Sequence, residues 1–303
     1  MDQFLIIITF LLIGAGLRRV PDFSNETGNV LNLFVIYVSM PALILLNYPK
    51  MVFSSDLLVL MIMPWAVLLV TCAVILFFSR IFKWKRSVTG CLLLLIPLGN
   101  TSFFGLPMIR AFFGESAIPY ALVYDQVGSF LGLAVYGSFI LAVYGTGGSR
   151  PTIKGVFKKI IIFPPFIALL AAIALRPFNY PDVFTNLLNI LASTLVPVIM
   201  IAVGFQLTLK LNKELSFQLG FGLLIKLIAV PAAALLFCKI TGLEGEAVKI
   251  SIFETGMPPM VSAGALAILA NLSPSLTSAL VGIGLILSFA TLPVLYQMLS
   301  FIN

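Results

Sequence analysis

Apolar residues recur in long runs along almost the whole chain, and only short polar segments separate the runs. A helix needs roughly 20 apolar residues to cross a bilayer, and this rule predicts about ten spans. Their approximate bounds are Gln3–Leu17, Gly28–Asn47, Asp56–Ile81, Ser87–Phe113, Ala117–Tyr144, Ile160–Leu175, Val183–Leu207, Leu215–Ile240, Ala247–Ala270 and Leu276–Phe301. The pattern therefore predicts an all-α polytopic membrane protein.

Two of these spans contain residues that interrupt helices. The fourth contains the stretch from Pro97 to Pro107, which holds two glycines, and the ninth contains the stretch from Glu254 to Pro259, which holds Gly256 and two prolines. Proline removes a backbone donor and clashes with the preceding turn. Within a membrane such a break survives only inside protein or beside a wet cavity. Interrupted spans at corresponding places in two halves indicate the binding site of a secondary transporter.

The two halves of the chain match each other at a nearly constant spacing. The matched positions are Pro41 with Pro197, Asn100 with Glu254, Ala121–Val123 with Ala279–Val281, and Ser129–Phe130 with Ser288–Phe289. Several matches near one spacing are the signature of an internal repeat. We therefore predict a five-plus-five duplication, with one repeat in residues 1–150 and the other in residues 151–303.

Basic residues are unevenly divided between the two faces of the predicted bundle. The loops after spans one, three, five and seven carry more than twice as many Lys and Arg residues as the loops on the other face. By the positive-inside rule the richer face is cytoplasmic, so both termini are expected outside. Five spans in each half then make the second repeat inverted relative to the first, a topology of secondary transporters.

Composition narrows the possible functions. The chain is 60% hydrophobic and 10% charged, whereas about a quarter of a typical soluble sequence is charged. The net charge of +7 comes from short loops between spans, so we expect no nucleic-acid partner. The sequence contains no histidine, which removes imidazole metal sites and the commonest acid–base catalyst. We expect neither an enzyme nor a metal or cofactor.

Each break favours anion binding through backbone groups. The N-terminus of a half-helix presents free N–H groups and the positive end of the helix dipole, which suits a carboxylate. Asn100, Thr101 and Ser102 add neutral polar groups, although the same groups could simply satisfy the broken backbone. The predicted substrate-binding residues are Asn100, Thr101, Ser102, Gly105, Pro107, Gly256, Met257 and Pro258.

Three charged residues are predicted at membrane depth, where an ionisable group is functional by default. Glu254 would repel an anion when ionised, which suits proton coupling; a sodium ligand or a structural partner for Lys226 are the alternatives. Asp125 is a similar candidate, or lies near an interface. Lys226 could pair with either acid or extend to a surface. We expect the coupling ion to be H⁺ or Na⁺.

Several of these stretches resemble the auxin efflux carrier family over nearly the whole chain. The segment from Leu31 to Leu43 resembles its second helix, and Asn100–Pro107 followed by Phe113-Gly114 resembles its first broken helix. Tyr120–Gln126 and Met257–Pro259 are similar to its bacterial branch of malate- and malonate-type permeases. The resemblance implies ten helices, of which broken helices four and nine cross, as in bile-acid symporters and sodium–proton antiporters.

The resemblance also implies a mechanism and partners. It implies a dimerising scaffold of helices 1, 2, 6 and 7 and a mobile elevator unit of helices 3–5 and 8–10. It makes Gln126 a supporting-site residue beside Asp125. Members carry organic anions; the long central loop of many plant auxin exporters is missing here, which favours a bacterial carboxylate carrier. We therefore expect an organic-anion substrate, the bacterial inner membrane as location, and a homodimer.

Three other functions remain to be weighed. A sodium-coupled symporter of the bile-acid type would share the architecture and would need several oxygen ligands at the crossing. A passive channel fits a duplicated, twice-broken helix less well than alternating access does. An intramembrane enzyme would need acids, a Ser/Lys pair or metal ligands converging at one depth, and no such motif stands out.

Overall fold

The computed structural model describes residues 2–50, 57–146, 152–207 and 213–299. Every regular element in this part of the chain is a helix. The helical stretches long and apolar enough to cross a membrane are, among the described residues, Thr27–Asn47, Leu57–Ile81, Glu115–Tyr144, Asp182–Gln206, Ser216–Thr241 and Pro274–Leu299. These six coincide with predicted spans to within a few residues, which confirms a multi-pass helical membrane protein.

The chain folds into two compact units, each assembled from segments that are distant in sequence. Unit 1 comprises Met1–Ser54, Ser102–Leu122 and Phe157–Leu207. Unit 2 comprises Ser55–Thr101, Val123–Val156 and Thr208–Asn303. The first broken span therefore contributes its two parts to different units.

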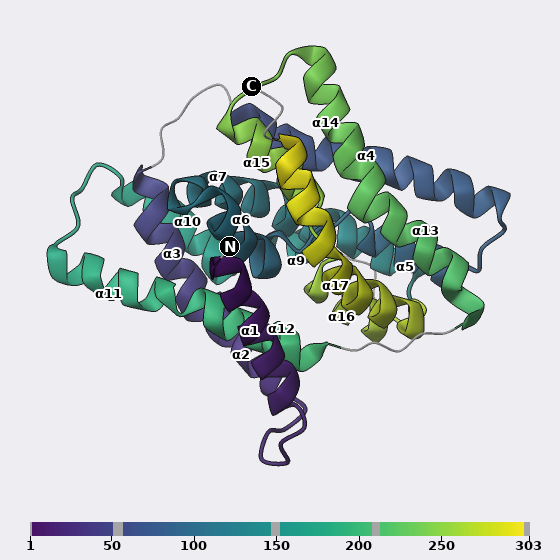
Figure 1. The fold of residues 1–303 in the computed structure, drawn as a ribbon, viewed down its shortest axis with the longest axis horizontal. Helices are drawn as coiled ribbons and strands as arrows, with labels where there is room; N and C mark the ends of the chain where they lie inside the picture. Colours follow the sequence, from purple (N-terminus) through teal and green to yellow (C-terminus); the bar gives the residue numbers. More distant parts are fainter. Residues whose placement is uncertain (1, 51–56, 147–151, 208–212, 300–303) are drawn as a thin grey trace. The chain divides into compact units, whose positions relative to one another are not determined.

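Unit 1 is a bundle in which glycines allow close helix contact. Gly14 faces the carbonyl group of Ile201, and Gly204 faces that of Leu11, with no room for a Cβ atom at either glycine. Small residues of this kind let membrane helices approach closely, so α1 and α12 lie side by side (Figure 1). The elements are α1 (Asp2–Leu17), α2 (Thr27–Phe34), η1 (Val35–Ser39), α3 (Met40–Asn47), η2 (Tyr48–Lys50), α6 (Leu106–Phe113), η4 (Glu115–Ala117), α7 (Ile118–Val123), α10 (Pro164–Leu175), α11 (Asp182–Ser193) and α12 (Leu195–Gln206).

Unit 2 is built around α5 (Arg86–Leu95), which is buried from Val88 to its end. A helix apolar on every side belongs in a core, and the leucines from Leu92 to Leu95 pack against the surrounding elements. These are α4 (Leu57–Ile81), η5 (Tyr124–Phe130), η6 (Leu133–Gly137), α8 (Ser138–Tyr144), η7 (Lys213–Leu215), α13 (Ser216–Leu224), η8 (Ile225–Ala229), α14 (Val230–Thr241), α15 (Glu246–Thr255), α16 (Val261–Leu269) and α17 (Pro274–Leu299).

Three prolines within the spans follow wider helical turns and do not end their helices. Three π-helical turns each end two residues before a proline: η1 before Pro41, η3 (Thr101–Gly105) before Pro107, and η8 before Pro231. Proline lacks an N–H group and its ring clashes with the carbonyl four residues earlier. A wider turn accommodates both effects, so these spans continue through their prolines.

The breaks in the fourth and ninth spans are shorter than predicted. In the fourth span α5 ends at Leu95 and η3 begins at Thr101, so Ser102 to Pro107 are helical. Pro107 lies at the start of α6, directly after η3, and the wider turn of η3 accommodates its missing N–H group. In the ninth span Glu254 and Thr255 complete α15, and the break covers only residues 256–260.

The helix ends also correct the predicted match between Asn100 and Glu254. Asn100 directly precedes the second half-helix of its span, as Met260 does in the ninth span. Glu254 instead belongs to the last turn of a first half-helix. The two residues therefore do not occupy equivalent positions relative to their breaks.

Residues 145–159 lie between two predicted spans, and their glycines and lysines predict a loop. The structure instead places helix α9 there, from Ile153 to Ile161. Ile153, Phe157 and Ile160 recur at helical spacing between the lysines. Lys154 and Phe157 are both exposed.

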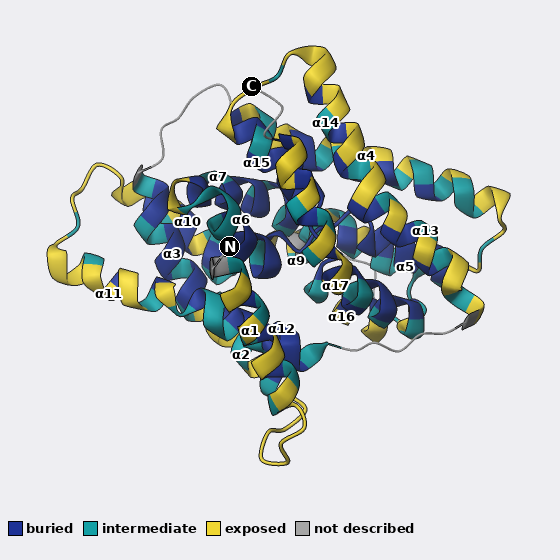
Figure 2. Ribbon diagram, in the orientation of Figure 1, coloured by how far each residue is buried: buried dark blue, intermediate teal, exposed yellow. Residues whose placement is uncertain are grey.

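Large apolar side chains cover the outer surfaces of both units. Figure 2 shows exposed bands along α4, α11 and α14; Leu69 of α4, for example, is 66% exposed. Soluble proteins rarely expose large contiguous apolar patches, whereas a bilayer solvates such side chains. The surface thus agrees with membrane-spanning helices.

Candidate functional site

The two broken helices meet within unit 2 through their backbones. The Asn100 N–H donates to the Pro258 carbonyl at 2.8 Å, and the Met260 N–H donates to the Leu98 carbonyl at 3.1 Å. These bonds flank an antiparallel bridge between Gly99 and Pro259. The exchange satisfies groups that the glycine- and proline-containing segments could not pair within a helix. Each break therefore holds the other in place.

The Asp125 carboxylate lies beside this contact and accepts two side-chain hydrogen bonds. The Thr101 hydroxyl donates to Oδ1 at 2.5 Å, and the Gln126 amide donates to Oδ2 at 2.8 Å. All three side chains are at least 99% buried within the protein. Asp125 and Gln126 belong to the π-helical η5, an element often found at functional sites. The carboxylate is therefore held by two fixed donors.

Glu254 is buried differently. Its side chain is 1% exposed, and neither carboxyl oxygen has a hydrogen-bond partner in the described part of the chain. Asp125 repels the charged form of Glu254, and Lys226 attracts it. A buried polar group without a hydrogen bond is costly. Packing and hydrogen bonding among the described residues therefore do not explain why an acid lies at this position.

Lys226 reaches the same region from the π-helical η8 of the eighth span. Its side chain is 1% exposed, so it does not extend to a surface. Its Nζ atom donates to the Thr255 carbonyl at 3.3 Å. Because the Glu254 oxygens accept no hydrogen bond from Lys226 or from any other described residue, the lysine acts on that carboxyl through the electric field of its charge.

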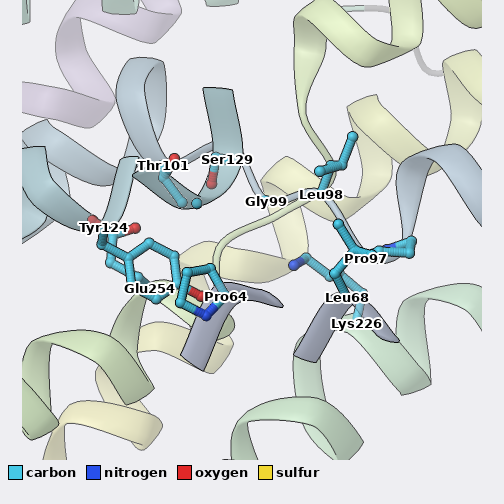
Figure 3. Close-up of a pocket in the computed structure, with 11 residues that line it drawn as sticks. Pro64, Leu68, Pro97, Leu98, Gly99, Thr101, Tyr124, Ser129, Lys226 and Glu254 are labelled. Atoms are coloured by element: carbon cyan, nitrogen blue, oxygen red, sulfur yellow. The ribbon is translucent and has the colours of Figure 1, made fainter. Parts of the chain in front are cut away.

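These groups line a small cavity in unit 2 (Figure 3). In Figure 3 the Lys226 nitrogen points toward the Gly99 segment, on the opposite side of the view from Thr101 and Tyr124. The cavity volume is about 10 Å³, close to the space that one water molecule needs. The lining residues are Pro64, Leu68, Pro97, Leu98, Gly99, Thr101, Tyr124, Gly128, Ser129, Lys226 and Glu254. A malonate-sized anion does not fit into this conformation.

The structure divides the predicted site residues between two places. Ser102, Gly105 and Pro107 belong to unit 1 and do not line the cavity. The other predicted residues lie in unit 2, all of them buried: Asn100, Thr101, Asp125, Gln126, Lys226, Glu254, Gly256, Met257 and Pro258. Of these, Thr101, Lys226 and Glu254 line the cavity. The Asn100 side-chain nitrogen has no hydrogen-bond partner among the described residues.

The other eight lining residues were missing from the predicted site, among them Tyr124, Ser129 and Pro64. Tyr124 directly precedes Asp125, and Ser129 belongs to the Ser129–Phe130 repeat match, so both carried a weak sequence signal. Pro64 lies inside α4 without breaking it, and a single proline within an apolar span gives no indication that it faces a cavity.

The sequence matches the family of proteins described as "Membrane transport protein" over residues 1–148 and 149–296. An uncharacterised transporter of Methanocaldococcus jannaschii is 30% identical over 271 residues, 85% of each chain. One from Methanothermobacter thermautotrophicus is 24% identical over 295 residues, 96% of each chain. A Rhizobium meliloti protein provisionally named a malonate transporter is 22% identical over 244 residues, 77% of this chain and 74% of its own.

Proposed function

We propose that this chain is a secondary carrier for a small organic anion. The chain belongs to the membrane transport protein family of the auxin efflux carriers. The observation that carries the proposal is the meeting of two interrupted helices beside Glu254, a buried carboxyl without a hydrogen-bond partner in the described residues. Interrupted helices of this kind form the substrate sites of secondary transporters.

The proposed substrate class is a carboxylate of malate, malonate or auxin type. The half-helix of α16 begins directly after the break, so its free N–H groups and positive dipole end suit an anion. The Asn100 amide supplies a further buried donor without a partner among the described residues. The name of the Rhizobium meliloti relative favours malonate as the first substrate to test. The proposed contacts are Asn100, Thr101, Ser102, Gly105, Pro107, Gly256, Met257 and Pro258.

Transport requires a conformation other than the one described. A cavity with room for about one water molecule cannot admit an organic anion, so the site must open before substrate binds. We propose alternating access in which the third to fifth and eighth to tenth predicted spans move as an elevator. The first, second, sixth and seventh predicted spans would form the scaffold of a homodimer. Both termini would lie outside the plasma membrane, as the basic loops indicate.

The proposed coupling ion is a proton carried by Glu254. An ionised Glu254 would repel a carboxylate, whereas a protonated one can donate a hydrogen bond to it. Binding of proton and anion would therefore be linked, and release of one would favour release of the other. Sodium coupling, as in bile-acid symporters, is the alternative, and Asp125 with its neighbouring oxygens is the group that would serve it.

Malonate flux into proteoliposomes tests this proposal. Glu254→Gln removes the titrating group and keeps its shape, so uptake driven by a pH gradient should fall at least about tenfold, whereas counterflow exchange of labelled malonate should remain. Glu246→Gln is the matched control, because Glu246 is an exposed acid at the start of the same helix.

The outcomes separate the possible roles. Loss of both uptake and exchange in folded Glu254→Gln protein would assign Glu254 to structure or binding instead of coupling. Uptake that collapses without sodium, and not with an uncoupler, would favour the symporter alternative. If the wild-type protein moves none of a panel of malonate, malate, succinate and indole-3-acetate, the carboxylate proposal is wrong.

A further inference from the structure

Lys226 is, among the described residues, the buried side chain that carries a positive charge. It lies near the middle of the membrane-spanning stretch Ser216–Thr241. An ammonium group at membrane depth is expensive unless other groups compensate its charge. Packing alone would favour an apolar side chain there, so the lysine needs an electrostatic explanation.

The end of α15 shows what the ammonium does. A helix leaves its last four carbonyl groups without intrahelical partners, and in α15 these belong to residues 252–255. Three are satisfied locally: Ile252 by the Thr255 hydroxyl at 2.6 Å, Phe253 by the Gly256 N–H at 3.1 Å, and Glu254 by the Met257 N–H at 3.2 Å. The fourth, the Thr255 carbonyl, accepts its hydrogen bond from Lys226 at 3.3 Å. The ammonium therefore completes the negative end of a broken helix.

The surrounding groups are those that would hold a small hard cation. The Thr255 carbonyl contacts the ammonium, and the small cavity that Lys226 lines is also lined by Glu254 and, on its other side, by the hydroxyl-bearing Thr101 and Ser129. Carboxylate, carbonyl and hydroxyl oxygens are typical ligands of hard cations, and the C-terminal ends of half-helices coordinate Na⁺ in ion-coupled carriers. A Cβ atom at Gly99 would lie 3.2 Å from the Lys226 nitrogen, so the glycine leaves room for the ammonium.

We propose that Lys226 is a built-in cation, occupying as part of the chain the position where a sodium-coupled carrier would bind a free ion. The inference rests on the proposed function only in linking this position to transport. The fixed ammonium completes the end of α15 and attracts the ionised Glu254 carboxylate. Glu254 is then the group whose charge changes, and the wild-type protein needs no sodium ion at this position.

Thermal unfolding of the purified protein in detergent tests the proposal without knowledge of the transported anion. Lys226→Ala removes three methylene groups and the ammonium, which together match n-propylammonium. In choline chloride the variant should melt below the wild type. Propylammonium chloride or sodium chloride at the same ionic strength should raise its melting temperature by at least about 2 °C, as expected for a ligand that binds the folded state.

Two controls test whether the effect of the salts is specific to the position of Lys226. Lys239→Ala removes an exposed lysine from the same span, so its melting temperature should be the same in all three salts. The wild type should also be indifferent to sodium, because its own ammonium fills the position. Wild-type protein that sodium stabilises over choline would overturn the proposal, as would a folded Lys226→Ala variant that neither cation stabilises.

A second variant covers the case in which Lys226→Ala does not fold. Lys226→Ala/Glu254→Gln removes one charge of each sign, so it should fold and melt above Lys226→Ala if unbalanced negative charge causes the defect. Failure of the double variant to recover would show that Lys226 acts through packing and would overturn the proposal. Neither result depends on transport, so a wrong substrate class would leave this test intact.

Discussion

Asn100 presents two groups to the site, and they have different tasks. Its backbone N–H holds the Pro258 carbonyl and would do so with any side chain except proline. Its side-chain nitrogen has no hydrogen-bond partner among the described residues although the residue is 2% exposed. A buried amide donor without a partner is the signature expected of a ligand contact.

We therefore expect Asn100→Ala to weaken substrate binding and to leave the fold intact. A hydrogen bond to a charged group contributes about 1.5–3 kcal/mol, so the affinity for malonate should fall by roughly tenfold to a hundredfold. The stability should change by less than about 1 kcal/mol, since the side-chain nitrogen has no described hydrogen bond to lose. Calorimetric titration and thermal unfolding measure the two effects.

Thr101→Val is the comparison for this variant. It removes the hydroxyl that donates to Asp125 and leaves a buried carboxylate with one donor fewer, which should destabilise the protein by about 1–3 kcal/mol. If Asn100→Ala is the less stable of the two, or binds malonate as tightly as the wild type, Asn100 is a structural residue.

At the scale of whole elements, the sequence predicted the helices well and their interruptions less well. Ten apolar runs identify where helices lie because burial in lipid depends on composition, which is local. The length of a break is not local: Pro107 fits a helix because the wider turn of η3 precedes it, and no pattern shows that in advance. The lysines of α9 similarly concealed a short amphipathic helix.

The residues of the candidate site could be predicted from the sequence, but their arrangement could not. Asp125, Glu254 and Lys226 could be found from sequence because charges within apolar runs are conspicuous. Their arrangement could not, since it depends on the pairing of Gly99 with Pro259 across a long stretch of chain. Spacing left open which acid Lys226 would meet, and the structure shows it bonded to a backbone carbonyl instead.

The contact between α1 and α12 allows a prediction about an element. A Cβ atom at Gly204 would overlap the Leu11 carbonyl group, and a helix backbone cannot yield as a flexible side chain can. Gly204→Leu should therefore separate the two helices and lower the free energy of unfolding by at least about 2 kcal/mol. Gly220→Leu is the matched control, because Gly220 is exposed on α13 with no atom within 4 Å of its Cβ position. Thermal unfolding measures the stability of both variants. Equal stability would show that Gly204 does not pack against the Leu11 carbonyl group.

At the scale of the whole molecule, the inverted repeat is the prediction with the widest consequences. The first loop of each repeat follows one span, so inversion places these two loops on opposite sides of the membrane. Ser24 and Asn179 are exposed residues in these loops, after the first and the sixth predicted spans. Basic loops further predict that Ser24 is cytoplasmic and Asn179 external.

Cysteine labelling in intact cells measures both properties at once. The native Cys72, Cys91 and Cys238 have no disulfide and are replaced by alanine to give a silent background. A membrane-impermeant maleimide should then label Asn179→Cys in intact cells and Ser24→Cys only after permeabilisation. The reverse pattern would leave the repeat inverted and correct only its orientation. Labelling of both from one side would contradict inversion itself, because an odd number of spans per repeat cannot place equivalent loops together.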